Sequence, residues 1–121
     1  MFWNFTPPAT NESNQRFFAR DLPARDFGLV RVFVKNLPPG AYQINIYRVG
    51  YQSNDVYTAY LKLGSPPNLS REQIRELAEE NDGRPVSSQR VRVTAGRPFE
   101  RDVLLRENEA YLITLERHAS R

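Results

Sequence analysis

The chain has 121 residues, of which 40% are hydrophobic and 12% aromatic, and it carries a net charge of +3 at pH 7. This length and composition predict a single globular domain over residues 1–121. Because cysteine is absent, a disulfide framework, a thiolate metal site and a thiol nucleophile are excluded. The basic residues are scattered between acids, whereas a nucleic-acid-binding protein usually presents a basic patch, so no nucleic-acid partner is expected.

Neither the N-terminus nor any other segment resembles a targeting or membrane element. No apolar run approaches the roughly 18–20 residues that span a bilayer. The opening MFWNFTPP lacks the basic and apolar regions of a signal peptide. We therefore expect no membrane partner and leave the compartment open, with the cytoplasm slightly favoured. The abrupt, strand-like start suggests a chain cut from a longer parent.

The first half of the chain predicts a short strand, a loop and a hairpin. Residues 2–5 (FWNF) are strand-prone, and residues 6–26 form a polar loop that could hold a short strand near Phe17 and Phe18. Residues 28–36 and 41–49 alternate between apolar and polar side chains on either side of a Pro-Pro-Gly turn, which predicts a two-stranded hairpin. The inward positions are Val30, Val32, Val34, Tyr42, Ile44 and Ile46.

A strand, an elbow and a helix follow. Residues 56–63 (VYTAYLKL) are rich in aromatic and β-branched residues at their start and are predicted to form a strand. In residues 64–69 a glycine and two prolines restrict the path of the chain into a helix. That helix has a capping box at Ser70 and Gln73, and it places Ile74, Leu77 and Ala78 on one side.

In the last third of the chain, apolar and polar residues alternate again, and this pattern completes the prediction of the fold class. Three strand-like runs, residues 89–94, 99–105 and 110–118, are separated by the turns AGRP and ENE. Short strands at this spacing predict an all-β protein. Its fold would be a two-sheet antiparallel β-sandwich of the fibronectin or immunoglobulin type, with one short helical insertion near residues 70–82.

No residue pattern identifies a catalytic or metal site. The only histidine, His118, is close to the C-terminus and is expected to be a solvated tail residue. Counting leaves a pair of catalytic carboxylates open, but the acids on the predicted helix and strands occupy solubility positions. We therefore predict no catalytic residue, no metal site and no cofactor.

Exposed aromatic rings would offer a different activity. A flat ring with a polar edge suits the face of a sugar, so Trp3, Tyr51 and Tyr60 are candidates for a sugar-binding platform. The alternative for the tyrosines is ordinary packing, because half-buried aromatic residues are common in sheets.

The stretch YRVGYQSNDVYTAYLKLGSPPNLSREQIREL, residues 47–77, resembles part of the C-terminal β-sandwich domain of glycoside hydrolase family 39. The similar elements, in order, are Tyr47-Arg48-Val49, Ser53-Asn54, Tyr57-Thr58-Ala59-Tyr60, Gly64-Ser65-Pro66 and the helix with Gln73 and Leu77. The opening FWNF and the closing YLITLERH also resemble the two ends of that domain. The chain departs from the family at Gly50 and Gln52, where an aspartate and a histidine are usual, and at Tyr60 and Leu63.

The resemblance implies a non-catalytic accessory domain. In that family, which contains β-xylosidases and α-L-iduronidases, the catalytic glutamates lie on a (β/α)₈ barrel for which this chain has no room. The dipeptide Asn108-Glu109 echoes a catalytic Asn-Glu pair but falls in a turn, so no role is transferred to it. The expected partner is a catalytic barrel in cis or a second copy of the chain. The candidate interface residues, which could equally cover the sandwich core, are Tyr57, Tyr60, Leu61, Leu63 and Pro66.

Two other classes of function remain open from the sequence. One is a free-standing carbohydrate-binding module, which three exposed aromatic rings in a row would favour. The other is a small enzyme, which would be supported by hydrolysis of aryl-xylosides by this chain alone.

Overall fold

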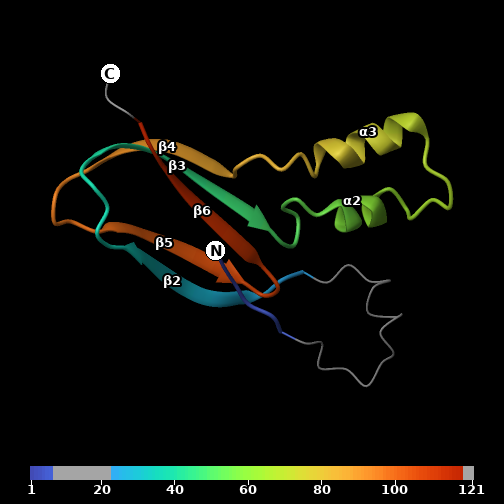
Figure 1. Cartoon of the computed structure of the whole chain (residues 1–121). Helices are drawn as coiled ribbons and strands as arrows, with labels where there is room; N and C mark the ends of the chain where they lie inside the picture. The colour runs from blue at the N-terminus through green and yellow to red at the C-terminus, as the bar shows by residue number, and fades with distance from the viewer. Residues whose placement is uncertain (7–22, 119–121) are drawn as a thin grey trace.

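The computed structural model describes residues 1–6 and 23–118, which form two antiparallel sheets and a pair of short helices (Figure 1). The helices and strands, in chain order, are β1 (Phe2–Trp3), β2 (Asp26–Val34), β3 (Gly40–Val49), α2 (Val56–Lys62), α3 (Arg71–Glu79), β4 (Ser87–Val93), β5 (Phe99–Arg106) and β6 (Ala110–Arg117). The expected strand near Phe17 and Phe18 lies outside the described residues. No helix in the described ranges has the length and apolar character needed to cross a membrane.

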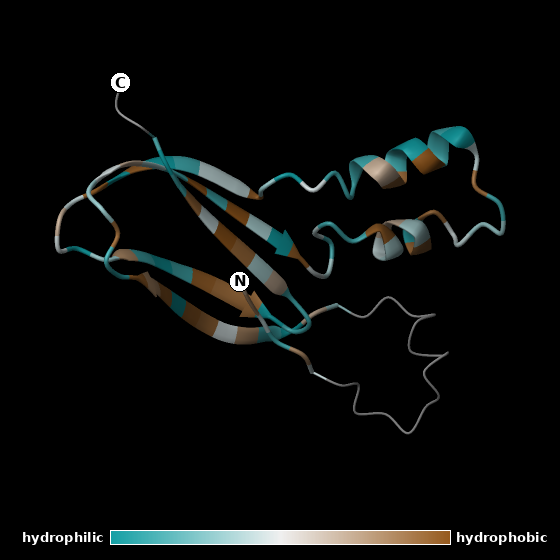
Figure 2. Cartoon of the chain, viewed as in Figure 1, coloured by the Kyte–Doolittle hydropathy of each residue, from teal (hydrophilic) through white to brown (hydrophobic). Residues whose placement is uncertain are grey.

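The two sheets confirm the predicted all-β sandwich. One sheet has four strands in the order β1-β6-β3-β4, and the other pairs β2 with β5. The more buried residues alternate along β2, β3 and β5, as the sequence predicted, and they supply the core between the sheets. Figure 2 shows hydrophobic and hydrophilic residues following one another along these strands.

The predicted hairpin of residues 28–49 is wrong, because its two strands belong to different sheets. β2 pairs with β5, whereas β3 pairs with β4 and β6. The connection at residues 35–39 carries the chain from one sheet to the other. It begins with Asn36 in the left-handed region at φ 60 and contains two prolines, which lack amide donors. The strands on either side have apolar inner faces, and because they lie in different sheets these faces pack against each other.

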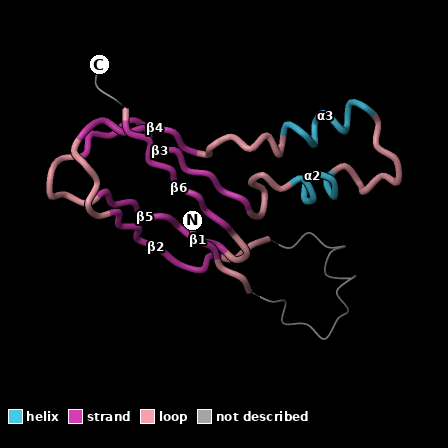
Figure 3. The backbone as a smooth tube through the Cα atoms, in the orientation of Figure 1, coloured by secondary structure: helices cyan, strands magenta, loops and turns pink. Residues whose placement is uncertain are grey.

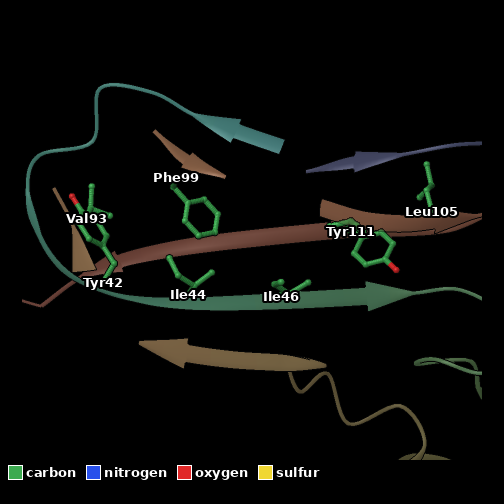
Figure 4. Packing of buried hydrophobic residues seen from close by; sticks show 8 residues of the cluster. Tyr42, Ile44, Ile46, Val93, Phe99, Leu105 and Tyr111 are labelled. Atoms are coloured by element: carbon green, nitrogen blue, oxygen red, sulfur yellow. The ribbon is translucent and has the colours of Figure 1, made fainter. Parts of the chain in front are cut away.

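The core lies between the sheets and comes mainly from β3, β5 and β6. Ile44, in the middle of β3, is fully buried, and Tyr111 stacks its ring on Phe2 of β1 at 5.4 Å between centroids. Figure 4 shows these inward side chains filling the space between the sheets. The buried cluster consists of Tyr42, Ile44, Ile46, Val93, Phe99, Val103, Leu105 and Tyr111.

Residues 56–63, predicted as a strand, form the helix α2 instead. Asp55 caps the helix by accepting the Thr58 amide at 3.0 Å, and Lys62 lies in the last turn, where a positive charge is favourable. The β propensity of Val56, Tyr57 and Tyr60 is outweighed by this cap and by packing against α3. The helical insertion therefore contains two helices rather than one.

The predicted helix of residues 70–82 is confirmed as α3, with its capping box. Ser70 Oγ accepts the Gln73 amide at 3.2 Å, and Gln73 Oε1 accepts the Ser70 amide at 2.9 Å. Leu77 is buried, whereas Ile74 on the predicted apolar side is 53% exposed. The helix thus buries only part of the side that the sequence marks as apolar.

We call residues 50–86 the helical excursion, because they leave the sandwich at the end of β3 and return at the start of β4. Figures 1 and 3 show α2 and α3 side by side beyond one end of the sandwich, with neither helix over a sheet face. The elbow between them has Gly64 and Ser65 in the left-handed region at φ 84 and 52. The Tyr60 hydroxyl donates to the Pro66 carbonyl at 3.0 Å, which fixes the elbow on α2.

Candidate interaction surfaces

A buried carboxylate lies where the helical excursion meets the sandwich. Glu109, in the turn between β5 and β6, is only 1% exposed. Its Oε1 accepts Arg48 Nη2 at 2.6 Å and Arg106 Nε at 2.8 Å, and its Oε2 accepts the Arg106 amide at 2.9 Å. We call these three residues the Glu109 cluster. Two guanidinium groups and a backbone amide satisfy both oxygens, which makes burial of the charge tolerable.

The Glu109 cluster holds the N-terminal strand and the first residues of the excursion together. The Glu109 amide donates to Asn4 Oδ1 at 3.2 Å, and Arg106 Nη2 donates to the Tyr51 carbonyl at 2.9 Å. The Arg48 carbonyl accepts Asn54 Nδ2 at 2.8 Å. The base of the excursion is therefore fixed by polar contacts rather than by an apolar core.

Gly50 is the residue that makes room for this carboxylate. A Cβ atom at position 50 would lie 2.6 Å from Cγ of Glu109, closer than two carbon atoms can approach. Gly50 is one of the departures from the family 39 pattern, and its lack of a side chain is what allows Glu109 to pack here.

Reasoning from the sequence missed the Glu109 cluster. It placed Asn108-Glu109 in a turn, which is correct, but nothing in a turn sequence indicates a buried acid. One signal in the sequence could have found it. Arg48 occupies an inward position on an otherwise apolar strand face, and a buried arginine requires a counter-charge. Because both Glu109 oxygens are engaged and the side chain is buried, this carboxylate has no access to a substrate.

The candidate interface residues lie together on α2 and the elbow. Tyr57 is 42% exposed, while Tyr60, Leu61, Leu63 and Pro66 are half-buried. The excursion exposes further large apolar side chains that were not among the candidate interface residues, namely Val56, Leu69, Ile74 and Val86. None of these residues contributes to the sandwich core.

The three candidate sugar-platform residues come from three separate elements. Trp3 on β1 is 65% exposed, whereas Tyr51, after β3, and Tyr60, on α2, are half-buried. The Tyr60 hydroxyl is already bonded to Pro66. Trp3 is thus the one of the three that presents most of its surface to solvent.

The outer face of the two-stranded sheet also carries apolar side chains. Phe27, Leu29 and Phe33 on β2 and Leu104 on β5 are each about half or more exposed. The ion pair between Arg31 and Asp102, with Nε–Oδ1 at 2.7 Å, crosses the middle of this face. Hydrogen bonding to Arg31 lowers the pKa of Asp102. The sequence indicated this face only through Phe33, which interrupts the polar alternation of the strand.

Acidic side chains elsewhere lie where the sequence predicted. Glu72, Glu76, Glu79 and Glu80 are exposed on and just after α3, and Glu100 and Glu116 are exposed on the strands. His118 is exposed, and its amide continues the ladder by donating to the Ala41 carbonyl at 2.9 Å. Among residues 1–6 and 23–118, no three acidic or histidine side chains converge in a way that could hold a metal ion.

Parts of larger solved structures have the same fold as this chain. No protein-family model and no curated protein sequence matches the chain. Among solved structures, the GH39 enzyme from Xanthomonas axonopodis pv. citri aligns with 96% of the chain at a TM-score of 0.91 and 32% identity. A monomeric β-xylosidase from Caulobacter crescentus CB15 aligns with 97% at a TM-score of 0.88, also at 32% identity.

The chain is built like a domain of a family 39 glycoside hydrolase. A third structure, a GH39 β-xylosidase from Caulobacter crescentus, aligns less fully, with a TM-score of 0.51 and 25% identity over 78% of the chain. The resemblance predicted from residues 47–77 and from both ends of the chain is therefore confirmed. The chain spans 23% of the length of each of the first two enzymes, so it corresponds to one region of such a protein.

Proposed function

We propose that this domain is a non-catalytic accessory domain that braces the catalytic barrel of a family 39 glycosidase in cis. The size of the match supports this, because the chain aligns with 23% of each similar enzyme. The catalytic residues of the assembled enzyme would then belong to the other part, and the work of this domain would be mechanical.

The projecting helical excursion is the observation that carries the proposal. Its base is fixed by the Glu109 cluster, its helices are capped at Asp55 and Ser70, and its elbow is held by the Tyr60 hydroxyl. An element ordered in advance loses little conformational entropy when it docks. The side chains that it leaves exposed, among them Tyr57 at 42%, are large and apolar and are suited to burial against a neighbouring body.

Docking within one polypeptide is favoured over self-association. The similar β-xylosidase from Caulobacter crescentus CB15 is described as monomeric. If that property extends to a parent of this chain, then the exposed apolar side chains of the excursion are covered by another part of the same molecule. Contacts between copies, the other partner expected from the sequence, remain an outcome of the test below.

A domain replacement tests the proposal. The region of the monomeric β-xylosidase from Caulobacter crescentus CB15 that matches this chain is replaced by residues 1–121, and the chimera is compared with that enzyme lacking the region. We expect the chimera to keep aryl-xyloside hydrolysis to a higher temperature than the truncated enzyme, with a mass corresponding to one copy. Equal heat inactivation of the two proteins would contradict the bracing role, and a mass of two or more copies would assign the surface to self-association.

Two variants locate the contact. Tyr57→Lys places a charge in the proposed interface and should lower the inactivation temperature of the chimera. Glu79→Lys changes an exposed residue on α3 and should leave that temperature unchanged. Both variants should unfold at the wild-type temperature in the isolated chain. Hydrolysis by the isolated chain, abolished by changing one carboxylate, would instead make this domain an enzyme.

The alternative, a free-standing carbohydrate-binding module, rests on the 65% exposure of Trp3. Titration of the isolated chain with xylo-oligosaccharides and glycosaminoglycan fragments, followed by tryptophan fluorescence, tests it directly, because Trp3 is the only tryptophan. Saturable binding that is lost in Trp3→Ala would support a binding module. An unchanged spectrum at millimolar sugar would leave the accessory role as the function.

A further inference from the structure

Strand register brings five uncharged residues together on the outer face of the four-stranded sheet, at the end from which the excursion projects, and a sixth lies beside them. Trp3 lies opposite Ala110, and Ala110 lies opposite Val49, so these three form one row across β1, β6 and β3. Leu112 lies opposite Tyr47 in the next row on the same face. Val86, just before β4, donates its amide to the Ile46 carbonyl at 2.7 Å and so lies beside the end of the β3–β4 pairing. We call these six residues the Trp3 patch.

The Trp3 patch is open to solvent. Trp3 is 65% exposed, Val49 55%, Val86 52% and Leu112 41%. Met1 and Phe5, which flank β1, are exposed by 78% and 76%. A contiguous set of exposed large apolar side chains on one rigid sheet face is a feature of interaction surfaces.

The patch has a sharp polar boundary on its own face. Further along β3 and β4, Gln43, Asn45 and Ser88 are linked by side-chain hydrogen bonds of 2.7 Å through the Ser88 hydroxyl. Beyond them lie the exposed Arg90 and Arg92. The apolar part therefore covers only the half of the face nearest the excursion.

The opposite outer face of the sandwich fits an apolar partner less well. There Phe33 lies opposite Glu100, and the Arg31–Asp102 ion pair separates Phe33 from Leu29 and Leu104. A partner that covered this face would have to remove an ion pair from water, a cost that its Coulomb attraction does not reliably offset. The Trp3 patch contains no charged side chain and carries no such cost.

We infer that the catalytic part of a family 39 glycosidase packs on the Trp3 patch, in one footprint that continues onto the excursion. This inference rests on the proposed accessory function. The patch runs directly into the excursion, because Val49 is followed by Gly50 and the exposed Val56 and Tyr57 lie a few residues further along the chain. Since the chain aligns with 23% of each matched enzyme, the rest of such an enzyme is large enough to cover both surfaces.

Side-chain footprinting with hydroxyl radicals separates the two faces. The isolated chain and the chimera described above are labelled in parallel, and oxidation is measured by mass spectrometry. We expect Trp3 to lose most of its reactivity in the chimera, while Phe27 and Phe33 on the opposite face react as they do in the isolated chain. Protection of Phe27 and Phe33 with Trp3 still reactive would overturn the inference in favour of the other face.

A pair of leucine variants provides an independent test. Leu112→Lys in the patch and Leu104→Lys on the opposite face change the same residue type at similar exposure, 41% and 51%. We expect Leu112→Lys to lower the inactivation temperature of the chimera more than Leu104→Lys, with equal effects in the isolated chain. Equal effects in the chimera would overturn the inference while leaving the accessory function intact. A chimera no more stable than the truncated enzyme would contradict the accessory function itself.

Discussion

The sandwich and the helical excursion are held together by different forces. The sandwich buries a continuous apolar cluster between two sheets, with Ile44 at its centre. The excursion buries little apolar surface, mainly Leu77, and depends on caps, the Tyr60–Pro66 hydrogen bond and the ion pairs of the Glu109 cluster. The stabilisation from apolar burial is non-directional and grows with the area buried, whereas hydrogen bonds are directional. The sandwich therefore supplies stability, and the excursion supplies a shaped surface.

The largest expected effect is in the sandwich core. Ile44→Ala removes a fully buried side chain from the central strand and should lower the free energy of unfolding by about 4 kcal/mol. Ile74→Ala on α3 is the matched control, because that isoleucine is 53% exposed, and it should change stability by about 0.5 kcal/mol or less. Urea unfolding followed by circular dichroism measures both. Similar losses for the two variants would contradict the division between the two regions.

The second largest effect is expected for Glu109→Gln, which should lower the free energy of unfolding by about 3 kcal/mol. The change leaves two partly buried guanidinium groups without their counter-charge. Glu107→Gln is the control, since the partner of Glu107, Arg25, is 83% exposed, and we expect little change. Hydrogen exchange should also show faster exchange of excursion amides in Glu109→Gln than in Ile74→Ala. A Glu109→Gln protein as stable as Glu107→Gln would show that the cluster does not anchor the excursion.

Removing a cap should act on the excursion alone. Ser70→Ala deletes the acceptor for the Gln73 amide and should destabilise α3 by about 1 kcal/mol. Hydrogen exchange should detect this as faster opening of α3, with the amides of β3 and β6 unchanged. Ser70→Asp, which retains a capping acceptor, should restore the wild-type exchange rates. If the α3 amides still exchange fast in Ser70→Asp, then loss of the cap is not the cause of the faster opening.

The smallest expected effect is a pH dependence of α2. Burial disfavours the charged form of Asp55, but hydrogen bonds from Thr58 and Gln52 outweigh it and lower the pKa of Asp55 in the folded chain. A lowered pKa stabilises the fold above the unfolded pKa of about 3.9, and this contribution is lost as the pH falls through the folded pKa. In acid the Thr58 amide should therefore exchange in excess of the rate expected from its intrinsic pH dependence, so that its protection factor falls. Asp55→Asn, which caps without titrating, should remove that excess.

The sequence predicted the parts of the fold that follow from local periodicity. Alternation identified the inward residues of β2, β3, β5 and β6, and the capping box located α3. It could not show which strands pair, because the inward faces of β2 and β3 look alike whether the strands lie in one sheet or in two. The predicted strand of residues 56–63 failed because β propensity mostly reflects packing on a sheet, and this segment lies beyond the sandwich.

The surfaces were harder to predict than the core. The candidate residues Tyr57, Tyr60, Leu61, Leu63 and Pro66 do lie together on α2 and the elbow, and their role stays a prediction. The Trp3 patch could not be found from the sequence, because its members are residues 3, 47, 49, 86, 110 and 112, and only the pairing of the strands brings them together. The same holds for Glu109, whose two arginine partners lie 61 and 3 residues away in the chain.

The excursion departs from one strand and returns on its immediate neighbour, since β3 and β4 pair along their length. Because β3 continues for three residues beyond its last pair with β4, Ile46–Ser87, the two ends of the insertion are held roughly 10 Å apart by strands that do not belong to the insertion. A loop of a few residues could span the same gap. This junction is a natural place for grafting: segments of different length or sequence can be exchanged there to alter the outline of the domain without redesigning its interior.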